Sequence, residues 1–265
     1  MLVTYALFTY NQEKFIRDAV RSALDQTYTP LQIIISDDSS TDGTFDLIKE
    51  ETANYSGPHE LILNRNPINI GLIGHINKIF DISEGEFIIA AAGDDISLPS
   101  RTSEIVAEFK DTRALVIHHL AIAMDNESQV KDTVLPPKEL LNKSIARAAW
   151  SQSIYLGATG AWNKEIYRLF GSIKNNDAYE DQVLGFRAML HDRLHFINKP
   201  LLYYRTGSGI SNTKKLSKAN LKNCIGLQIQ KIEDLNSLKN PRRIIFSIAY
   251  LKLILCRITK ILLGR

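Results

Sequence analysis

Cysteine and long hydrophobic runs are both scarce in this sequence. Its 265 residues include two cysteines, Cys224 and Cys256, too few for a disulfide framework and without the paired spacing of metal ligands. We therefore expect free, buried thiols in a reducing compartment. No stretch of 18 uncharged apolar residues occurs, so the sequence predicts no transmembrane helix. The N-terminus lacks the basic and apolar regions of a secretory signal, and we expect it to begin the fold as a strand.

A large excess of charge of one sign is also missing. The 32 Lys and Arg against 29 Asp and Glu give a net charge of +3, which does not indicate a nucleic-acid-binding protein. A hydrophobic content of 45% argues against disorder. The charge is unevenly spread, however, because seven of the cations and none of the acids follow Asp234. The sequence thus predicts a mildly acidic body with a cationic C-terminal segment.

Strand-like and helix-like patterns alternate through the first 120 residues. The predicted strands are 2–9, 31–36, 60–63, 86–92 and 114–120, and the predicted helices between them are 13–24, 44–50, 73–82 and 99–109. This alternation is typical of an α/β fold whose mainly parallel sheet is covered on both faces. In such a sheet, ligands bind beyond the carboxyl ends of the strands.

The second half of the chain is expected to be mostly helical. Residues 125–137 are polar and predict a loop. The expected elements after it are helices at 138–150, 163–170, 180–190 and 217–238, with a short β pair at 194–197 and 201–204.

Two polar clusters follow predicted strands. Asp37-Asp38-Ser39-Ser40 ends one strand, where the residues either cap the next helix or accept hydrogen bonds from a base or ribose. Gly93-Asp94-Asp95 ends another, where the acids either cap a helix or hold a divalent cation that carries substrate phosphates.

Two further segments are candidates for chemistry. Glu180-Asp181 starts a predicted helix, where acids are favoured by the helix dipole but one carboxylate could also act as a general base. Arg205 lies at the base of a Gly/Ser-rich loop, which is either a surface loop of no consequence or one that closes over a phosphate.

Taken together, these segments resemble the family 2 glycosyltransferases of the GT-A fold, which are inverting enzymes that use nucleotide sugars. The resemblance runs through ALFTYNQEKFIRDAVRSALDQTYTPLQIIISDDSSTDGT, and it continues in Asn69-Ile70-Gly71, Gly85-Glu86-Phe87-Ile88 and Gly93-Asp94-Asp95. Glu180-Asp181-Gln182 and Tyr204-Arg205 match later and looser motifs. It is specific over residues 2–100, weaker over 155–211 and absent beyond about 215.

The resemblance implies a fold and a site. The fold would be a GT-A type, Rossmann-like, mainly parallel sheet flanked by helices, with a helical C-terminal extension. A glycosyltransferase domain would cover 1–212, with a nucleotide-sugar half at 1–120 and an acceptor half at 121–212, and the extension would cover 213–265. The residues implied for the nucleotide sugar are Thr9, Tyr10, Asp38, Asn69, Gly71, Asp94 and Arg205. Asp94 and Asp95 would hold a divalent cation, Mn²⁺ or Mg²⁺, and Asp181 would be the catalytic base, with Glu180 as the lesser candidate.

The sequence departs from the family pattern at two points. Ala92 replaces the first acid of the Asp-x-Asp element. Many members have a histidine in the loop after Tyr204-Arg205, whereas this chain has Gly207. Either Arg205 and Ser208 contact the diphosphate in its place, or the loop closes without a ligand.

Several aromatic residues have two interpretations. Of the pair His118-His119, one histidine is expected to point into the core. Trp150 and Trp162 either stack on a sugar or pack in the interior. The small residues from Gly157 to Ala161 occupy the place where the family builds part of its acceptor pocket.

The C-terminal residues 241–265 combine aliphatic side chains with cations. On a helix, one arc carries Lys239, Arg242, Lys252, Arg257 and Lys260, and the other side largely carries Ile245, Ile248, Leu255, Ile258 and Leu262. Such a helix either lies in an anionic membrane interface or docks on the protein's own body.

The sequence therefore predicts an inverting glycosyltransferase. It would transfer a sugar from a nucleotide-diphosphate sugar to a hydroxyl of a saccharide acceptor, lipid-linked as in bacterial surface-polysaccharide or O-antigen assembly. It would be cytoplasmic and peripheral on the inner face of the cell membrane, with no nucleic-acid partner. The alternatives are a sugar nucleotidyltransferase, which would want a Gly-rich, basic loop after the first strand, and a non-catalytic, membrane-associated nucleotide-sugar-binding protein.

Overall fold

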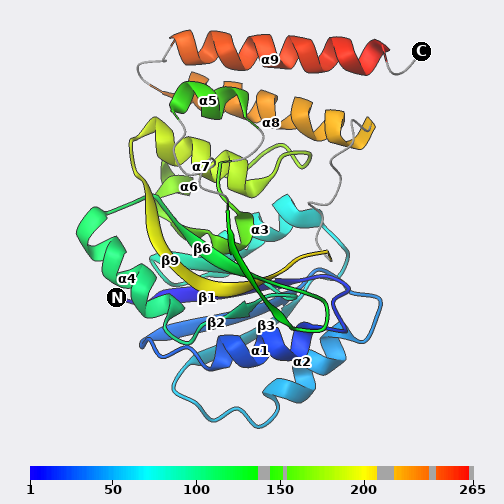
Figure 1. The fold of residues 1–265 in the computed structure, drawn as a ribbon, viewed down its shortest axis with the longest axis vertical. Helices are drawn as coiled ribbons and strands as arrows, with labels where there is room; N and C mark the ends of the chain where they lie inside the picture. Colours follow the sequence, from blue (N-terminus) through cyan, green and yellow to red (C-terminus); the bar gives the residue numbers. More distant parts are fainter. Residues whose placement is uncertain (137–143, 152–153, 208–217, 239–242, 263–265) are drawn as a thin grey trace.

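A central sheet organises the chain in the computed structural model (Figure 1), which describes residues 1–136, 144–151, 154–207, 218–238 and 243–262. Within these residues the sheet has nine strands in the order β3-β2-β1-β4-β8-β6-β9-β5, and β7 pairs with β6 outside this path. The strands are β1 (Val3–Thr9), β2 (Leu31–Asp37), β3 (Glu60–Arg65), β4 (Phe87–Ala92), β5 (Ile96–Ser97), β6 (Val116–Met124), β7 (Val130–Leu135), β8 (Ala161–Asn163) and β9 (Leu194–Arg205).

The first four strands are parallel and belong to the predicted strand–helix units. β1 lies between β2 and β4, with Thr9 opposite Asp37 and Phe8 opposite Ala92. Every residue of β2 is buried, as expected for a strand whose two faces are both covered by helices. The predicted mainly parallel sheet is confirmed in this half.

Helices cover both faces of the sheet. They are α1 (Ile16–Leu24), α2 (Thr44–Thr52), α3 (Gly71–Ile82), α4 (Arg101–Thr112), α5 (Ile145–Trp150), α6 (Glu165–Phe170), α7 (Glu180–Leu190), α8 (Lys218–Ser237) and α9 (Arg243–Leu262), with a 3-10 turn η2 (Gly157–Thr159). The apolar core accordingly has two parts. One part packs α1, α2 and α4 against the sheet, and the other packs α3 and α5–α9 against its opposite face.

Two expectations for the second half were wrong. The segment expected to be a loop contains the strand β7, which is mostly exposed and pairs with β6. The expected short β pair is one strand, β9, because Pro200 lies opposite Leu120 at a shift in register, where the missing N–H is tolerated.

The C-terminal helices form layers above α7, with α9 outermost and α5 and α8 beneath it (Figure 1). Cys224 on α8 and Cys256 on α9 are joined by a disulfide, so the expectation of free thiols was wrong. The spacing of two cysteines 32 residues apart gave no sign that the helices bring them together. The predicted domain boundary near residue 212 stays a prediction, since residues 208–217, including Ser208, lie outside the described part of the chain.

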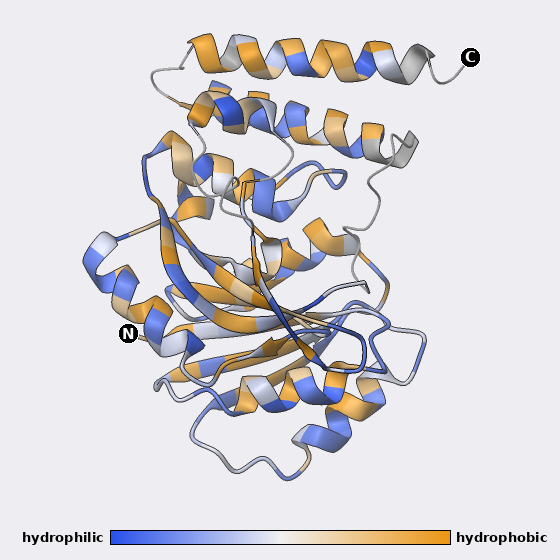
Figure 2. Ribbon diagram, viewed as in Figure 1, coloured by the Kyte–Doolittle hydropathy of each residue, from blue (hydrophilic) through white to orange (hydrophobic). Residues whose placement is uncertain are grey.

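α9 presents apolar side chains in two opposite directions. Its inner side chains are buried against the body, and they are Ile245, Ala249, Leu253 and Cys256. Its outer face exposes Ile244, Leu251, Ile254, Leu255 and Ile258, and hydrophobic colour runs along the helix in Figure 2. Of the aliphatic side chains predicted to lie opposite the cations, Ile245 is therefore docked on the body, whereas Leu255 and Ile258 are exposed. None of the described helices combines the length and the hydropathy needed to cross a membrane.

Candidate active site

The polar clusters predicted at strand ends do meet at one edge of the sheet. Asp38 donates its backbone N–H to the Thr9 carbonyl at 2.9 Å, and Gly93 donates its N–H to the Phe8 carbonyl at 2.9 Å. The ends of β1, β2 and β4 are thereby adjacent, and this part of the prediction is confirmed.

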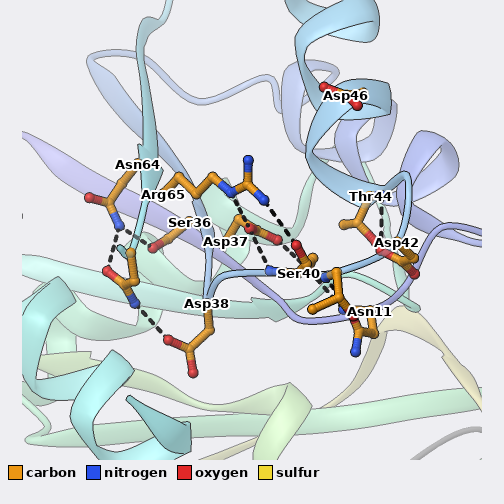
Figure 3. Close-up of polar contacts among 12 residues, drawn as sticks. Asn11, Ser36, Asp37, Asp38, Ser40, Asp42, Thr44, Asp46, Asn64 and Arg65 are labelled. Carbon is orange, nitrogen blue, oxygen red and sulfur yellow. Dashed lines mark hydrogen bonds and ion pairs between the residues drawn. The ribbon is translucent and has the colours of Figure 1, made fainter. Parts of the chain in front are cut away.

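The turn after β2 is built on the buried carboxylate of Asp37 (Figure 3). Asp37 accepts from the Ser40 backbone N–H at 2.9 Å and from the Ser40 hydroxyl, and Arg65 Nε lies 3.4 Å from its Oδ2. Ser39 adopts a left-handed conformation with φ of 64°, which turns the chain back on itself. Asp37 is thus a structural acid that shapes the turn.

Asp38 points the other way and binds the loop before α3. Its Oδ1 accepts from Asn66 Nδ2 at 2.8 Å and from the Ile70 N–H at 3.0 Å, and its Oδ2 accepts from the Gly71 N–H at 2.9 Å. Because a carboxylate offers about four acceptor positions, these three bonds leave one position on Oδ2.

Asn69 and Gly71 lie beside Asp38, as the sequence predicted. The side chain of Asn69 is exposed, and its Oδ1 also accepts from the Gly71 N–H at 3.0 Å. Gly71 has a φ of 73°, a backbone conformation that favours glycine, and it opens α3.

The end of β1 contributes Thr9 and Tyr10. Thr9 is buried, and its Oγ1 has no hydrogen-bond partner within the described residues. Tyr10 is 46% exposed, so its ring is available at the rim. Asn11, with φ of 52°, accepts from the Thr41 N–H at 2.9 Å and fixes the β1 turn to the β2 turn.

The turn after β4 holds the two candidate metal ligands in different surroundings. Gly93 packs so closely on the β1 turn that a Cβ would lie 2.4 Å from Gln12 Oε1. Asp94 is half-buried. Asp95 is buried; its Oδ1 accepts from the Arg205 N–H at 2.8 Å, and its Oδ2 has no partner in the described part of the chain. Burial, and next the negative charge of Asp94, raise the pKa of Asp95 well above its usual range.

Arg205 is only 1% exposed and lies behind this turn. Its guanidinium donates to the carbonyls of Asp94 at 2.9 Å and Asp125 at 2.6 Å, and to Ser128 Oγ at 3.1 Å. The Phe15 ring covers it at 4.2 Å. Arg205 thus joins the acid turn to the β6–β7 turn through its donors, an arrangement that the Tyr-Arg motif alone did not indicate.

Glu180 and Asp181 form the second acidic centre at the start of α7. Asp181 Oδ2 accepts from Gln182 Nε2 at 2.8 Å. Gly157 of η2 fits closely against Glu180, since a Cβ there would lie 2.6 Å from Glu180 Oε1. Burial raises the pKa of both carboxyls, and the charge of Glu180 raises that of Asp181 further.

A buried arginine that sequence reasoning missed connects the two acidic centres. Arg101 Nη2 donates to the Ala90 carbonyl of β4 at 2.7 Å and to the Ala158 carbonyl of η2 at 2.8 Å. Its Nε donates to His119 Nε2 at 2.9 Å, and its Nη1 donates to Ser97 Oγ. Arg101 therefore ties the strand before Asp94 to the turn that contacts Glu180. The two contacts that make this link are with backbone carbonyls, which no sequence motif marks.

Burial decides the alternatives for the two histidines and for Trp162. Both His118 and His119 are buried, rather than one of them. Trp162 is buried, stacks on Phe80 and donates its Nε1–H to Tyr155 Oη at 3.0 Å, so it packs in the core and is not exposed to a sugar. Trp150 lies on α5, is 39% exposed, and has Lys252 Nζ of α9 4.6 Å from its ring centroid.

A hollow of about 660 Å³ lies at the opposite edge of the sheet, before β4. Its lining is Phe80, Asp81, Glu84, Gly85, Glu86, Lys164, Tyr167 and Arg168. None of the predicted site residues contributes to it, and we assign it no role.

Known proteins resemble this chain in sequence. A family model described as glycosyl transferase family 2 matches residues 6–183, more than half of the chain. EpsH of Bacillus subtilis (strain 168), whose name gives it as a glycosyltransferase, is 27% identical over 215 residues, covering 77% of this chain and 60% of EpsH. WfaP of Escherichia coli, named as a UDP-Glc:alpha-D-GlcNAc-diphosphoundecaprenol beta-1,3-glucosyltransferase, is 29% identical over 139 residues, covering 52% of this chain and 53% of WfaP. The chain spans 37% to 60% of the length of the first curated relatives it matches.

Solved structures resemble it in fold. S. aureus TarS 1–349 in complex with UDP-GlcNAc has a TM-score of 0.69 at 20% identity, covering 95% of this chain and 72% of that one. The mannosyltransferase PcManGT from Pyrobaculum calidifontis, in complex with GDP-Man and Mn²⁺, has a TM-score of 0.65 at 16% identity, covering 96% and 69%. These neighbours confirm the predicted GT-A type α/β fold.

The chain belongs to glycosyl transferase family 2, because the family model matches more than half of it. Its GT-A type fold and the acids at its strand ends are consistent with that family.

Proposed function

We propose that this protein is an inverting glycosyltransferase that transfers a sugar from a nucleotide-diphosphate sugar to a hydroxyl of a saccharide acceptor. The observation that carries the proposal is the link made by Arg101, which ties the strand before Asp94 to the turn against Glu180. An acid turn suited to a divalent cation that carries the diphosphate and an acid pair suited to proton transfer are thereby built into one framework. Family membership supports the same reaction class.

The nucleotide would bind at the ends of β1 and β2. The remaining acceptor position on Asp38 suits an N–H of a base or a ribose hydroxyl, and the unpartnered Thr9 Oγ1 offers a second polar contact. The exposed Tyr10 ring suits stacking on a base, with Asn69 and Gly71 lining the same pocket. Fold neighbours bound to UDP-GlcNAc and GDP-Man support a nucleotide sugar as donor.

A divalent cation fits the turn after β4. Asp94 is the half-buried acid there, and the buried Asp95 has an unpartnered Oδ2. Among the described residues no group of three or more His, Cys, Asp or Glu could hold a metal by itself. The residues therefore suit Mg²⁺ or Mn²⁺ held by one or two carboxylates together with diphosphate oxygens. Such an ion supplies positive charge for the leaving diphosphate, and the PcManGT complex with Mn²⁺ supports it.

Arg205 and Asp95 would support the turn that carries Asp94. Arg205 is buried and donates to the Asp94 carbonyl, and its backbone N–H is bonded to Asp95. We therefore assign Arg205 to holding the acid turn in shape, in place of the direct contact with the nucleotide sugar that the family resemblance implied.

Asp181 would take the proton from the acceptor hydroxyl as its oxygen attacks the anomeric carbon. A raised pKa makes its carboxylate a stronger base than an exposed aspartate, and Gln182 fixes its orientation. Glu180 is the lesser candidate, placed next to η2 where an acceptor would enter.

We infer a lipid-linked acceptor and a peripheral position on the cell membrane from the exposed face of α9. Its outer face exposes Ile244, Leu251, Leu255 and Ile258, and the segment has cations and no acids. Aliphatic side chains flanked by cations suit an anionic bilayer surface. WfaP, whose named acceptor is a diphosphoundecaprenol-linked sugar, supports this class of acceptor.

The donor class is tested by incubating the protein and Mn²⁺ with a panel of UDP, GDP and other nucleotide sugars. We expect one of them to raise the thermal midpoint clearly and to be hydrolysed slowly without acceptor. Substituting Asp94→Asn should remove the Mn²⁺ dependence of that shift, whereas Asp46→Asn, at an exposed acid on α2, should not. If no nucleotide sugar protects the protein, the proposal is wrong.

The membrane position is tested with the triple variant Leu251→Ser, Leu255→Ser and Ile258→Ser. We expect its partition into phosphatidylglycerol vesicles to fall at least about tenfold, because three apolar side chains no longer enter the interface. Leu169→Ser, at an exposed leucine on α6, should leave partition unchanged. Unchanged sedimentation of the triple variant would contradict the membrane assignment.

A further inference from the structure

A continuous chain of hydrogen bonds runs from a buried histidine on α3 to Asp38. His75 Nε2 lies 2.5 Å from Ser36 Oγ, and Asn64 Nδ2 donates to the same Oγ at 2.9 Å. Asn64 Nδ2 also donates to Asn66 Oδ1 at 3.2 Å, and Asn66 Nδ2 donates to Asp38 Oδ1 at 2.8 Å. Figure 3 shows the bonds from Ser36 through Asn64 towards Asp38. We call the four residues from His75 to Asn66 the polar chain.

The polar chain lies on a face of β2 that is otherwise apolar. Ser36 is two residues after Ile34, so both side chains point to the face of the sheet that α3 covers. Asn64 is the cross-strand partner of Ser36 on β3, and His75 and Ser36 are both buried. Burying polar groups costs free energy even when each has a partner, and aliphatic side chains would pack here without that cost. The polar residues therefore indicate a role in the site at the end of β2.

The donors of the polar chain are aligned towards Asp38. A carboxylate can only accept hydrogen bonds, so the Asn66 amide turns its Nδ2 to Asp38 and its Oδ1 to Asn64. The Asn64 amide then uses both of its hydrogens, one for Asn66 and one for Ser36. Flipping the Asn66 amide would place its Oδ1 against the carboxylate. The acceptor at the end of the chain thus determines how each amide is oriented.

The polar chain also joins β2 to α3 at a second point. The first point is Asp38, which accepts from the N–H of Gly71 at the start of the helix. The second is one helical turn later, where His75 contacts Ser36. The His75 ring is held in turn by Phe8 of β1, which meets it edge-on with 5.1 Å between the ring centroids. The carboxylate of Asp38 is therefore fixed from both β3 and α3, while one position on its Oδ2 stays open.

We propose that the polar chain positions the Asp38 carboxylate for the nucleotide of the donor. Its members are positioning residues, because they act through Asp38. This inference rests on the proposed nucleotide site at Asp38, and it adds residues that no motif of the sequence marked. Since the reacting atoms would lie near Asp181 and not near Asp38, the polar chain should affect donor binding and not the chemical step.

The first test separates donor binding from the chemical step. Asn64→Ala cuts the polar chain at a half-buried residue of β3, where truncation is tolerated best. We expect the Kd of the donor identified in the nucleotide-sugar panel to rise about fivefold, while kcat at saturating donor changes less than about twofold. His75→Phe keeps a ring against Phe8 but removes the bond to Ser36, and it should raise the Kd about threefold.

A double-mutant cycle tests whether the effect of His75 passes through Asn64. In Asn64→Ala the connection to Asp38 is already cut, so adding His75→Phe should not weaken donor binding further. If the two losses multiply in the double variant, the inference is overturned, because His75 then acts by another route. Should His75→Phe not fold, Ser36→Ala takes its place in the cycle with the same expectation.

The matched control is Thr4→Val at the opposite end of the strands. Thr4 is fully buried, and its Oγ1 donates to Gln32 Oε1 at 2.9 Å between β1 and β2. The control removes a buried side-chain bond of the same sheet, so it should lower stability but keep the donor Kd of the unmodified protein. An equal loss of donor affinity in Thr4→Val, or an unchanged Kd in folded Asn64→Ala, would overturn the role of the polar chain.

Failure of the proposed function would give a different result. Either no nucleotide sugar of the panel would bind the unmodified protein, or Asp38→Asn would bind the donor as tightly as the unmodified protein does. A donor that binds, a binding defect in Asp38→Asn and an unchanged Kd in Asn64→Ala would together contradict only the role of the polar chain.

Discussion

Two pairs of consecutive acids illustrate how differently one sequence pattern is used in this protein. Asp37-Asp38 ends β2, where the two carboxylates accept hydrogen bonds from Ser40, Asn66, Ile70 and Gly71. Glu180-Asp181 starts α7, where Asp181 accepts from Gln182 and burial raises the pKa of both acids.

The difference lies in the donors around each pair. Carboxylates that accept several hydrogen bonds from neighbouring loops hold those loops in place. Carboxylates that are buried with few donors bind protons more tightly, which suits proton transfer. We therefore expect the β2 pair to contribute chiefly to stability and to the shape of the binding site. The α7 pair is expected to contribute chiefly to proton transfer.

The largest effect on stability is expected for Asp38→Asn. The substitution replaces either Oδ2, which accepts from Gly71, or Oδ1, which accepts from both Asn66 and Ile70, with an amide donor. We expect a loss of about 3 kcal/mol in the free energy of unfolding, measured by denaturant titration, together with loss of nucleotide-sugar binding. Asp46→Asn on the exposed surface of α2 should cost less than about 0.5 kcal/mol. If Asp38→Asn and Asp46→Asn lowered the free energy of unfolding equally, the structural role assigned to the β2 pair would be contradicted.

A smaller effect of opposite sign is expected for the stability of Asp181→Asn. Because the folded protein raises the pKa of Asp181, its stability falls as pH rises from about 4 towards the folded value. Asparagine does not titrate, so the variant should be more stable by on the order of 1 kcal/mol at about pH 7.5, and the gain should vanish near pH 4.

Asp42→Asn is the control for this pH dependence. At Asp42 the raising effect of burial is outweighed by hydrogen bonds from Thr44 and Glu13, which lower the pKa. Its carboxylate therefore adds stability above about pH 4, and this contribution is lost as pH falls. The variant should be the less stable protein at neutral pH. A stability gain in Asp42→Asn, or none in Asp181→Asn, would contradict the comparison.

The sequence predicted this contrast only in part. The sequence predicted that Thr9, Asp38, Asn69 and Gly71 meet, because the carboxyl ends of parallel strands lie at one edge of a sheet and the motif resemblance grouped these residues. The buried cations Arg101 and Lys231 did not follow, since each binds backbone carbonyls far away in sequence. Side-chain identity carries no information about such partners.

The C-terminal helix shows the same limit. Its amphipathic pattern raised two alternatives, a membrane-facing helix and a helix docked on the body. In the structure one apolar face is docked and the other is exposed. Which aliphatic side chains face inward depends on α5 and α8, whose packing cannot be read from the helical periodicity of α9 alone.

The most direct test of the account is the transfer rate of Asp181→Asn, measured beside its affinity for the donor identified in the nucleotide-sugar panel. We predict that kcat falls about a thousandfold, because the acceptor hydroxyl loses its general base, while donor affinity changes less than about threefold. Transfer at the rate of the unmodified protein would contradict the assignment of Asp181 and, with it, the role given to the α7 acid pair.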